Sequence, residues 1–252
     1  MIDTPQNSSE YYVRRSCAFG TLGKPEKTIA DCEKALALNP SSAVAYFNKG
    51  KAHFELRQFE FALADFTSAI RIDPEFAQAY NARGVIYVEL RQEKMALSDF
   101  DEAIRLEPTT SLAYSNRARI FFRQARHERA LPDMNHAVRI AGDAQTFLAR
   151  AAILNELKLH EEAISDCDSA LSLDPNHINA FFERGKSFLY LSRNQEAIED
   201  LSLFLEHNPK TAAAYFIRAY AYKDLEMSQE SHDDLRKALT LDPSLSNLLV
   251  MN

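Results

Sequence analysis

The sequence predicts an all-α protein made of tandem helix pairs, and three observations predict it. Only six glycines and nine prolines occur in 252 residues, which favours long helices with short joints. Alanine, leucine, glutamate and arginine, all good helix formers, are abundant. Proline recurs every 34 residues in two runs, and a fixed period of this length indicates a solenoid. The runs are Pro40, Pro74 and Pro108, then Pro175, Pro209 and Pro243.

Seven units follow when each of these prolines is counted as position 32. Position 4 is aromatic in every unit and position 8 is small, while positions 20 and 27 are mostly alanine. Positions 4, 8 and 11 share one face of a first helix, A, and positions 20, 24, 27 and 28 share one face of a second helix, B. The proline ends helix B because it cannot continue the hydrogen-bond ladder. The units are 9–42, 43–76, 77–110, 111–143, 144–177, 178–211 and 212–245.

The fourth unit and the two ends are irregular. Unit 4 is one residue short, has Gly142 and Asp143 where the proline is expected, and places Pro132 at or just after the first turn of helix B. We read this as drift in a tolerant array, with a hinge between units 1–4 and 5–7 as the alternative. Residues 1–8 are polar and are expected to be flexible. Residues 246–252 are expected to cap the last helix through Leu248, Leu249 and Met251, or else to mediate self-association.

Every unit carries a basic residue at position 7 and an aspartate at position 23. Because the two helices of a unit run antiparallel, these positions lie at nearly the same level, and so do position 23 of one unit and position 7 of the next. Each aspartate can therefore reach its own cation, the following one, or both. We interpret the set as a structural ladder of partly buried ion pairs that fixes how the helices meet. The pairs are Arg15 and Asp31, Lys49 and Asp65, Arg83 and Asp99, Arg117 and Asp133, Arg150 and Asp166, Arg184 and Asp200, and Arg218 and Asp234.

The repeat resembles the tetratricopeptide repeat in its 34-residue period, its large residue at position 4, its small residue at position 8, its alanines at positions 20 and 27, and its closing proline. The resemblance covers residues 9–245. It departs from that pattern because tyrosine or phenylalanine replaces tryptophan and because position 7 is never leucine. The resemblance implies a right-handed superhelical α-solenoid of seven helix-turn-helix repeats.

Nothing in the sequence indicates catalysis. It has no glycine-rich phosphate loop, H-E-x-x-H or C-x-x-C motif, and its histidines are scattered. We therefore expect no catalytic residues, cofactor or metal. Cys32 and Cys167 occupy core position 24, and Cys17 has no helper residue that would make it a nucleophile.

The charge and hydropathy patterns limit partners and location. The net charge of −7 and the lack of a basic block argue against nucleic-acid binding. No apolar run is long enough to insert into a membrane, and there is no apolar signal core. Three cysteines fit a reducing, cytoplasmic compartment.

In tetratricopeptide arrays the A helices line a concave groove, and this resemblance implies a peptide-binding face here. Aromatic groups beside bases suit an extended peptide with acidic and apolar residues, although some of the aromatics could instead pack between A helices. The five-residue clamp of chaperone-binding members is absent, because only Asn48 fits it, and an asparagine ladder is incomplete. The expected binding residues are Phe47, Asn48, Lys51, Asn81, Arg119, Phe122, Arg123, Phe182, Lys186, Tyr190, Phe216 and Lys223.

We therefore expect a non-catalytic scaffold or adaptor that binds a protein or peptide segment in the groove. The alternatives are a structural subunit that joins a larger assembly through its ends or convex face, a co-chaperone without the clamp, and the regulatory arm of an enzyme.

Overall fold

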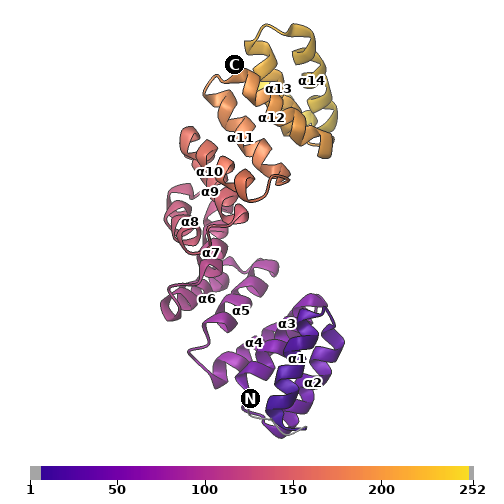
Figure 1. The fold of residues 1–252 in the computed structure, drawn as a ribbon, viewed down its shortest axis with the longest axis vertical. Helices are drawn as coiled ribbons and strands as arrows, with labels where there is room; N and C mark the ends of the chain where they lie inside the picture. Colours follow the sequence, from indigo (N-terminus) through magenta and orange to yellow (C-terminus); the bar gives the residue numbers. More distant parts are fainter. Residues whose placement is uncertain (1–6, 250–252) are drawn as a thin grey trace. The chain divides into compact units, whose positions relative to one another are not determined.

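The computed structural model describes residues 7–249, and in this range the chain forms helices and turns without a strand. It comprises two compact units, residues 1–120 and 121–252, each of which is described by itself. Figure 1 shows the helices following one another as successive hairpins along the chain. None of the helices in the described range is long and apolar enough to cross a membrane. The predicted all-α class is confirmed.

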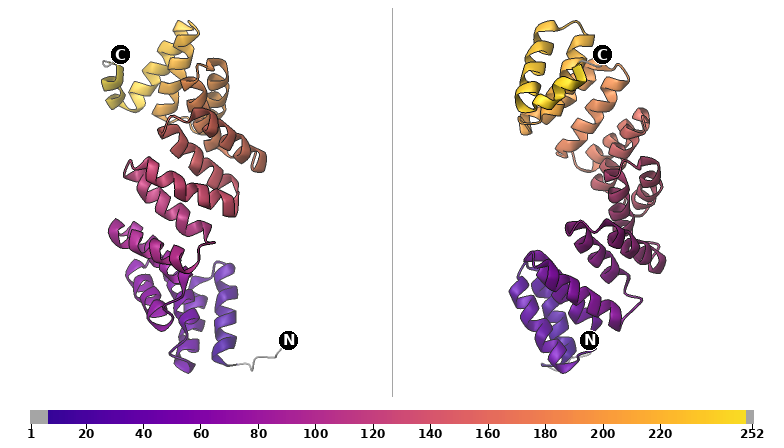
Figure 2. Two further views of the ribbon diagram at one scale, coloured as in Figure 1. Left: turned by 90° about the vertical axis from the view of Figure 1, so that its left-hand side faces the viewer. Right: turned by 180° about the vertical axis from the view of Figure 1, so that it is seen from behind.

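Unit 1 contains three complete helix pairs and the start of a fourth. The A helices α1, α3 and α5 each pack against their own B helix and are neighbours in turn, and α3 and α5 also pack against the B helix before them. Figure 2 shows the first four helices side by side. The helices are α1 (Ser9–Thr21), α2 (Pro25–Leu38), α3 (Ala43–Glu55), α4 (Phe59–Ile72), α5 (Ala77–Glu89), α6 (Glu93–Leu106) and α7 (Ser111–Arg123), which continues past the end of unit 1.

Unit 2 repeats the same packing, with α9, α11 and α13 as neighbouring A helices. Pro132 lies inside α8, which continues through it. A short 3₁₀ helix follows α14 and packs against it. Met251 lies outside the described residues. The elements are α8 (His127–Ala141), α9 (Ala144–Glu156), α10 (His160–Leu173), α11 (Ile178–Tyr190), α12 (Asn194–His207), α13 (Ala212–Asp224), α14 (Ser228–Leu241), η1 (Pro243–Leu245) and α15 (Ser246–Leu249).

Each A helix ends in a left-handed residue at position 15, which the sequence hardly signals. Only Gly23 is a glycine there. The amide of the next residue reaches back across the turn, as Gln92 N does to Tyr87 O at 2.8 Å. This is the bond that closes a helix through a left-handed C-terminal residue. The other six are Arg57, Arg91, Ala125, Lys158, Ser192 and Glu226.

The joint after α4 depends on Asp73, the residue before Pro74. Asp73 has extended backbone angles, as expected for a residue that precedes proline. Its Oδ1 accepts a hydrogen bond from Glu75 N at 3.1 Å, which closes a small turn. The fourth repeat, residues 111–143, ends differently. Gly142 adopts φ 56°, and Asp143 caps α9 by accepting a hydrogen bond from Thr146 N at 2.8 Å. The glycine and the cap thus replace the missing proline.

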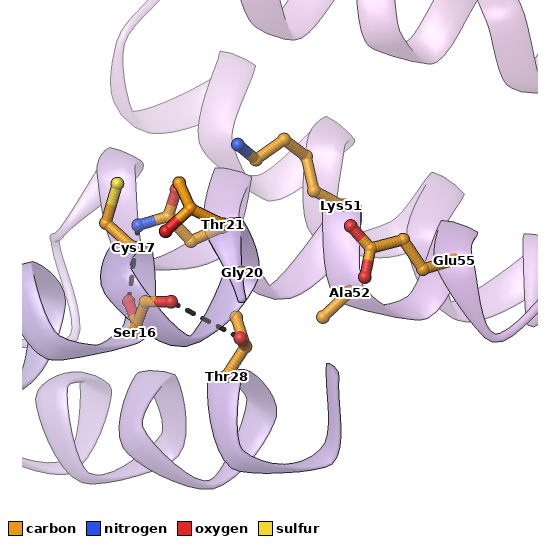
Figure 3. Close-up of a pocket in the computed structure, with 9 residues that line it drawn as sticks. Ser16, Cys17, Gly20, Thr21, Thr28, Lys51, Ala52 and Glu55 are labelled. Carbon is orange, nitrogen blue, oxygen red and sulfur yellow. Dashed lines mark hydrogen bonds between the residues drawn. The ribbon is translucent and has the colours of Figure 1, made fainter. Parts of the chain in front are cut away.

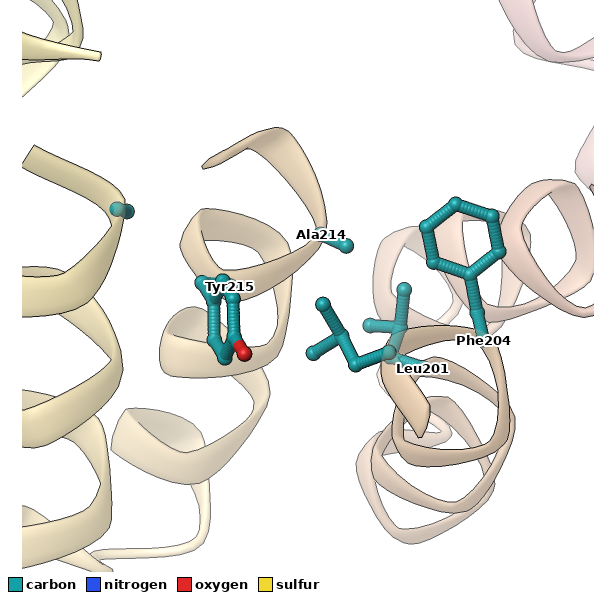
Figure 4. Packing of buried hydrophobic residues seen from close by; sticks show 6 residues of the cluster. Leu201, Phe204, Ala214 and Tyr215 are labelled. Atoms are coloured by element: carbon teal, nitrogen blue, oxygen red, sulfur yellow. The ribbon is translucent and has the colours of Figure 1, made fainter. Parts of the chain in front are cut away.

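Small residues let the helices approach, and large ones fill the gaps between them. The alanines at positions 20 and 27 are fully buried wherever they occur. In unit 1, Phe66 and Phe100 are buried over Gly50 and Gly84, where an added Cβ would come within 2.9 Å of a ring atom. In unit 2, Leu201, Phe204 and Tyr215 form part of one cluster with Ala214 (Figure 4).

Candidate functional site

Arg83 and Asp99 form a bidentate ion pair between α5 and α6 of one repeat. The Nε and Nη2 atoms of Arg83 each lie 2.8 Å from a different carboxylate oxygen of Asp99. Asp99 is 5% exposed. The hydrogen bonds to Asp99 raise the pKa of Arg83, against the effect of burial. The same two-bond arrangement joins Arg15 to Asp31, Arg150 to Asp166, Arg184 to Asp200 and Arg218 to Asp234.

Where another repeat comes before, these arginines also contact that repeat. The Nη1 atom of Arg184 lies 2.5 Å from Asp168 Oδ1, and that of Arg218 lies 2.8 Å from Ser202 Oγ. Both acceptors stand at position 25 of the preceding B helix. Arg117 reaches Asp101, at the same position, over 2.6 Å. One guanidinium group therefore connects three helices, and the contact at position 25 was not predicted from the sequence.

Repeat 2 uses lysine and obtains the second contact elsewhere. Lys49 Nζ lies 3.2 Å from Asp65 Oδ1, and His53 Nδ1 lies 2.7 Å from the other oxygen. Because a lysine cannot form a fork of two parallel N–H bonds, the imidazole supplies the remaining contact. His53 is 9% exposed and lies in the core.

The A face of unit 1, meaning Asn48, Lys51, Asn81, Asn116 and Arg119, carries amides and two exposed cations. Asn116 Nδ2 donates to Asn81 Oδ1 at 3.0 Å, and Arg119 Nη2 donates to Asn116 Oδ1 at 2.8 Å. Among the described residues, neither Lys51 nor Arg119 is in an ion pair, whereas every position-7 cation contacts an aspartate. Unlike the ladder, these two charges remain available to a ligand.

Phe47 and Phe182, two of the expected binding aromatics, pack inward. The Phe47 ring lies 4.8 Å from that of Phe76 and carries Lys51 over its face at 5.3 Å. Phe182 packs on Phe204 at 5.0 Å. Both are partly buried members of the core clusters. These two rings therefore take part in packing between helices.

The remaining expected residues of unit 2 form separate local contacts. Lys186 Nζ lies 2.7 Å from Glu156 Oε1, so this cation is neutralised. Tyr190, which is 64% exposed, stacks on His160 at 4.6 Å. Phe122 places its edge against His127 at 5.1 Å, and Arg123 is exposed. Phe216 lies 5.1 Å from Tyr220 and also packs against the core cluster that contains Phe204. Lys223 lies over the Tyr220 ring.

A cavity of about 130 Å³ opens between α1, α2 and α3, and sequence reasoning missed it (Figure 3). Ser16, Thr28, Asn48 and Ala52 are its buried lining. The signal that could have found it is Gly20, the only small residue at position 12 of any repeat.

The described residues contain no cluster of His, Cys, Asp or Glu that could hold a metal ion. Cys32 and Cys167 are buried, and Cys17 is exposed. Desolvation raises the pKa of the Cys32 thiol to about 11 and that of Cys167 still further. These two side chains are neutral thiols near pH 7 and behave as small apolar residues.

We expect one thiol per folded chain to react with an aromatic disulfide reagent at pH 7.5. The thiolate is the reactive species, and burial suppresses it at Cys32 and Cys167. The measurement is the number of equivalents of aromatic thiolate released per chain in native buffer and in urea, with three expected after unfolding. Fast release of two or more native equivalents would show that the core positions open readily.

Two known families match this chain. The family described as ETO1 C-terminal domain matches residues 14–188, which is well over half of the chain. The chain belongs to this family. A tetratricopeptide repeat family matches residues 182–245, and the helix pairs are tetratricopeptide repeats. This fold is typical of scaffolds for protein–protein interaction.

Solved structures of similar fold also match this chain. YrrB, described as a TPR protein with an unusual peptide-binding site, shares 24% identity, with a TM-score of 0.63 over 73% of this chain and 95% of that one. PilF of Pseudomonas aeruginosa shares 16% identity, with a TM-score of 0.74 over 87% and 96%. At these identities the likeness shows the fold alone.

A curated relative matches this chain over a short stretch. "Suppressor of RPS4-RLD 1" of Arabidopsis thaliana is 48% identical over 44 residues, which is 18% of this chain. The match spans 4% of that relative's length.

Proposed function

We propose that this tetratricopeptide array is a non-catalytic scaffold that binds an extended protein segment along its A face. The observation that carries the proposal is the contrast between two sets of cations. The position-7 cations are neutralised by aspartates, whereas Lys51 and Arg119 are exposed and, among the described residues, lie in no ion pair. Structural need does not account for these two charges.

The chemistry of the A face in unit 1 favours an acidic segment. Lys51 and Arg119 can bind carboxylates, and Arg119 is already oriented by its hydrogen bond to Asn116. Asn81 uses its oxygen to accept from Asn116, which leaves its Nδ2 for a peptide carbonyl. YrrB, which has the same fold, is described as having a peptide-binding site. Buried free thiols in the core support a reducing, intracellular location.

Charge reversal at both A-face cations is expected to abolish this binding. An array of 12-residue peptides of graded net charge is probed with the wild-type chain and with the Lys51→Glu/Arg119→Glu variant. Wild-type protein should retain acidic peptides. The variant should bind them at least about a hundredfold more weakly, since each lost contact to a charged group contributes roughly 1.5 kcal/mol.

Arg71→Glu/Lys94→Glu is the matched control, because both residues are exposed on B helices and lie in no ion pair within the described chain. It makes the same change in net charge away from the A face and should leave binding unchanged. Equal losses in the two variants would mean that net charge alone attracts the peptides, and this would refute the proposal. Circular dichroism establishes that both variants are folded.

A further inference from the structure

The cavity between α1, α2 and α3 exists because one side chain is missing. Position 12 lies near the end of each A helix, facing the next repeat. The residue there is Gly20 in repeat 1, and a Cβ built on it would find its nearest neighbour, Thr28 Oγ1, at 3.8 Å. The glycine therefore leaves room for a further group. The other repeats place larger side chains at this position: Phe54, Val88, Phe122, Asn155, Leu189 and Lys223.

Between repeats 5 and 6 the chain itself shows what fits the equivalent space. Asn155, at position 12, is 3% exposed. Its Nδ2 donates to the backbone oxygen and to Oε2 of Glu183, both at 2.9 Å, and its Oδ1 accepts from Ser187 Oγ at 2.5 Å. Glu183 and Ser187 stand at positions 6 and 10 of the next A helix. A carboxamide thus occupies this site and is bonded through both its nitrogen and its oxygen.

At the cavity, the residue equivalent to Glu183 is Asn48, which is polar and incompletely bonded, whereas Ala52 stands at the position of Ser187 and offers no side-chain hydrogen bond. Asn48, at position 6 of repeat 2, is 5% exposed and donates to Ser16 Oγ at 3.2 Å. The described residues supply no other hydrogen bond to its side chain, so Oδ1 and the second N–H can serve a ligand. Ser16 and Thr28 are occupied, because Ser16 Oγ donates to Val13 O at 2.7 Å and Thr28 Oγ1 to Ser16 O at 3.3 Å.

The rim of the cavity favours neither an anion nor a cation. Lys51 and Glu55 both line the opening and carry opposite charges, and the exposed Cys17 and Thr21 complete it. A cavity of about 130 Å³ holds roughly four water-sized groups, which is the size of an acetamide or propionamide. Asn48 offers both a donor and an acceptor, and a primary amide can satisfy both at once, whereas a carboxylate only accepts.

We propose that this cavity binds the side-chain carboxamide of an asparagine or glutamine in the segment that the A face holds. The bound amide takes the place that Asn155 occupies between repeats 5 and 6. This inference rests on the proposed function for the peptide itself, whereas the affinity of the cavity for an amide can be measured without any peptide.

Gly20→Asn is the decisive variant because it supplies the missing carboxamide from within the chain. Its matched control is Gly23→Asn, the same change three residues later, at a left-handed turn position with no atom near the added Cβ. Asparagine tolerates that conformation. Both variants should fold, as judged by circular dichroism and melting temperature.

The first measurement is a titration with propionamide, followed by amide and side-chain NMR shifts. Wild-type protein and Gly23→Asn should show saturable shifts at Asn48, Thr28 and Ala52, and Gly20→Asn should show none. Propionate and isobutane-saturated buffer serve as the charged and apolar comparisons. No shift in the wild type, equal shifts in Gly20→Asn, or a stronger response to propionate would overturn the assignment.

The second measurement is a peptide array in which each position is fixed in turn as Gln, Asn, Glu or Leu. We expect one position where Gln or Asn is preferred about tenfold, and this preference should vanish in Gly20→Asn while the preference for acidic residues remains. Acidic peptides bound without any amide preference would refute the cavity proposal and leave the scaffold function standing. If no peptide binds at all, the scaffold proposal fails and the propionamide titration alone decides the cavity.

Discussion

Replacing Arg83 with alanine is expected to destabilise the fold by about 3–5 kcal/mol, because Asp99 would remain buried without its partner. The carboxylate loses two charge-assisted hydrogen bonds at once. The measurement is the free energy of unfolding in urea, obtained from the far-UV circular dichroism of the wild-type and variant proteins.

Arg105→Ala is the control for this loss. Arg105 also forms a two-bond pair, with Glu102, but its side chain is 64% exposed. Exposed pairs contribute about 0–1 kcal/mol, so this variant should unfold almost as the wild type does. Similar costs for the two variants would show that burial of Asp99 is not what makes its pair matter.

Gly84→Ala should destabilise by about 1–3 kcal/mol, the cost of overpacking a filled core. The new Cβ would lie 2.7 Å from Phe100 Cε1, and Phe100 is fully buried. Gly20→Ala is the matched control. Its Cβ has ordinary contacts, so it should stabilise by about 0.5–1 kcal/mol through the higher helix propensity of alanine. Thermal and urea unfolding of both variants measure whether each substitution lowers or raises the stability of the fold.

A double substitution tests the cause of the Gly84 effect. Repeat 5 pairs Ala151 with Cys167 where repeat 3 pairs Gly84 with Phe100, and both members of the repeat 5 pair are fully buried. Adding Gly84→Ala to a Phe100→Cys background should therefore cost little or nothing. A coupling free energy of at least about 1 kcal/mol is expected. An unchanged penalty would place the strain in the backbone and not against the Phe100 ring.

Several features of the fold follow from local chemistry and could be predicted. The prolines and small residues reveal the seven-repeat period, because every repeat needs a helix breaker and small residues at the same positions. The spacing of Arg83 and Asp99 also follows, because antiparallel helices joined by a short turn bring positions 7 and 23 to one level. The helix ends at Arg91 and Lys158 could not be predicted, because neither residue favours the left-handed conformation it adopts.

The candidate site was harder to predict, because helix faces in a solenoid differ only in which neighbour covers them. Phe47 and Lys51 are both on α3, and both were expected to bind a ligand. The Phe47 ring instead packs on Phe76 with Lys51 above it. The cavity beside Gly20 was missed for a related reason: a missing side chain makes a pocket only when the next helix fails to fill the gap.

The sequence by itself determined the repeat, its helix pairs and the presence of one cation and one aspartate at matching levels in each pair, because these depend on spacing along the chain. Only the tertiary structure decided the partners. Asp200 binds Arg184 of its own repeat, while the remaining N–H group of that arginine crosses to Asp168 of the repeat before. An aspartate at position 23 lies level with the cation of its own repeat and with that of the next repeat. The choice between them therefore depends on how neighbouring helices pack, and that packing is a property of the folded array.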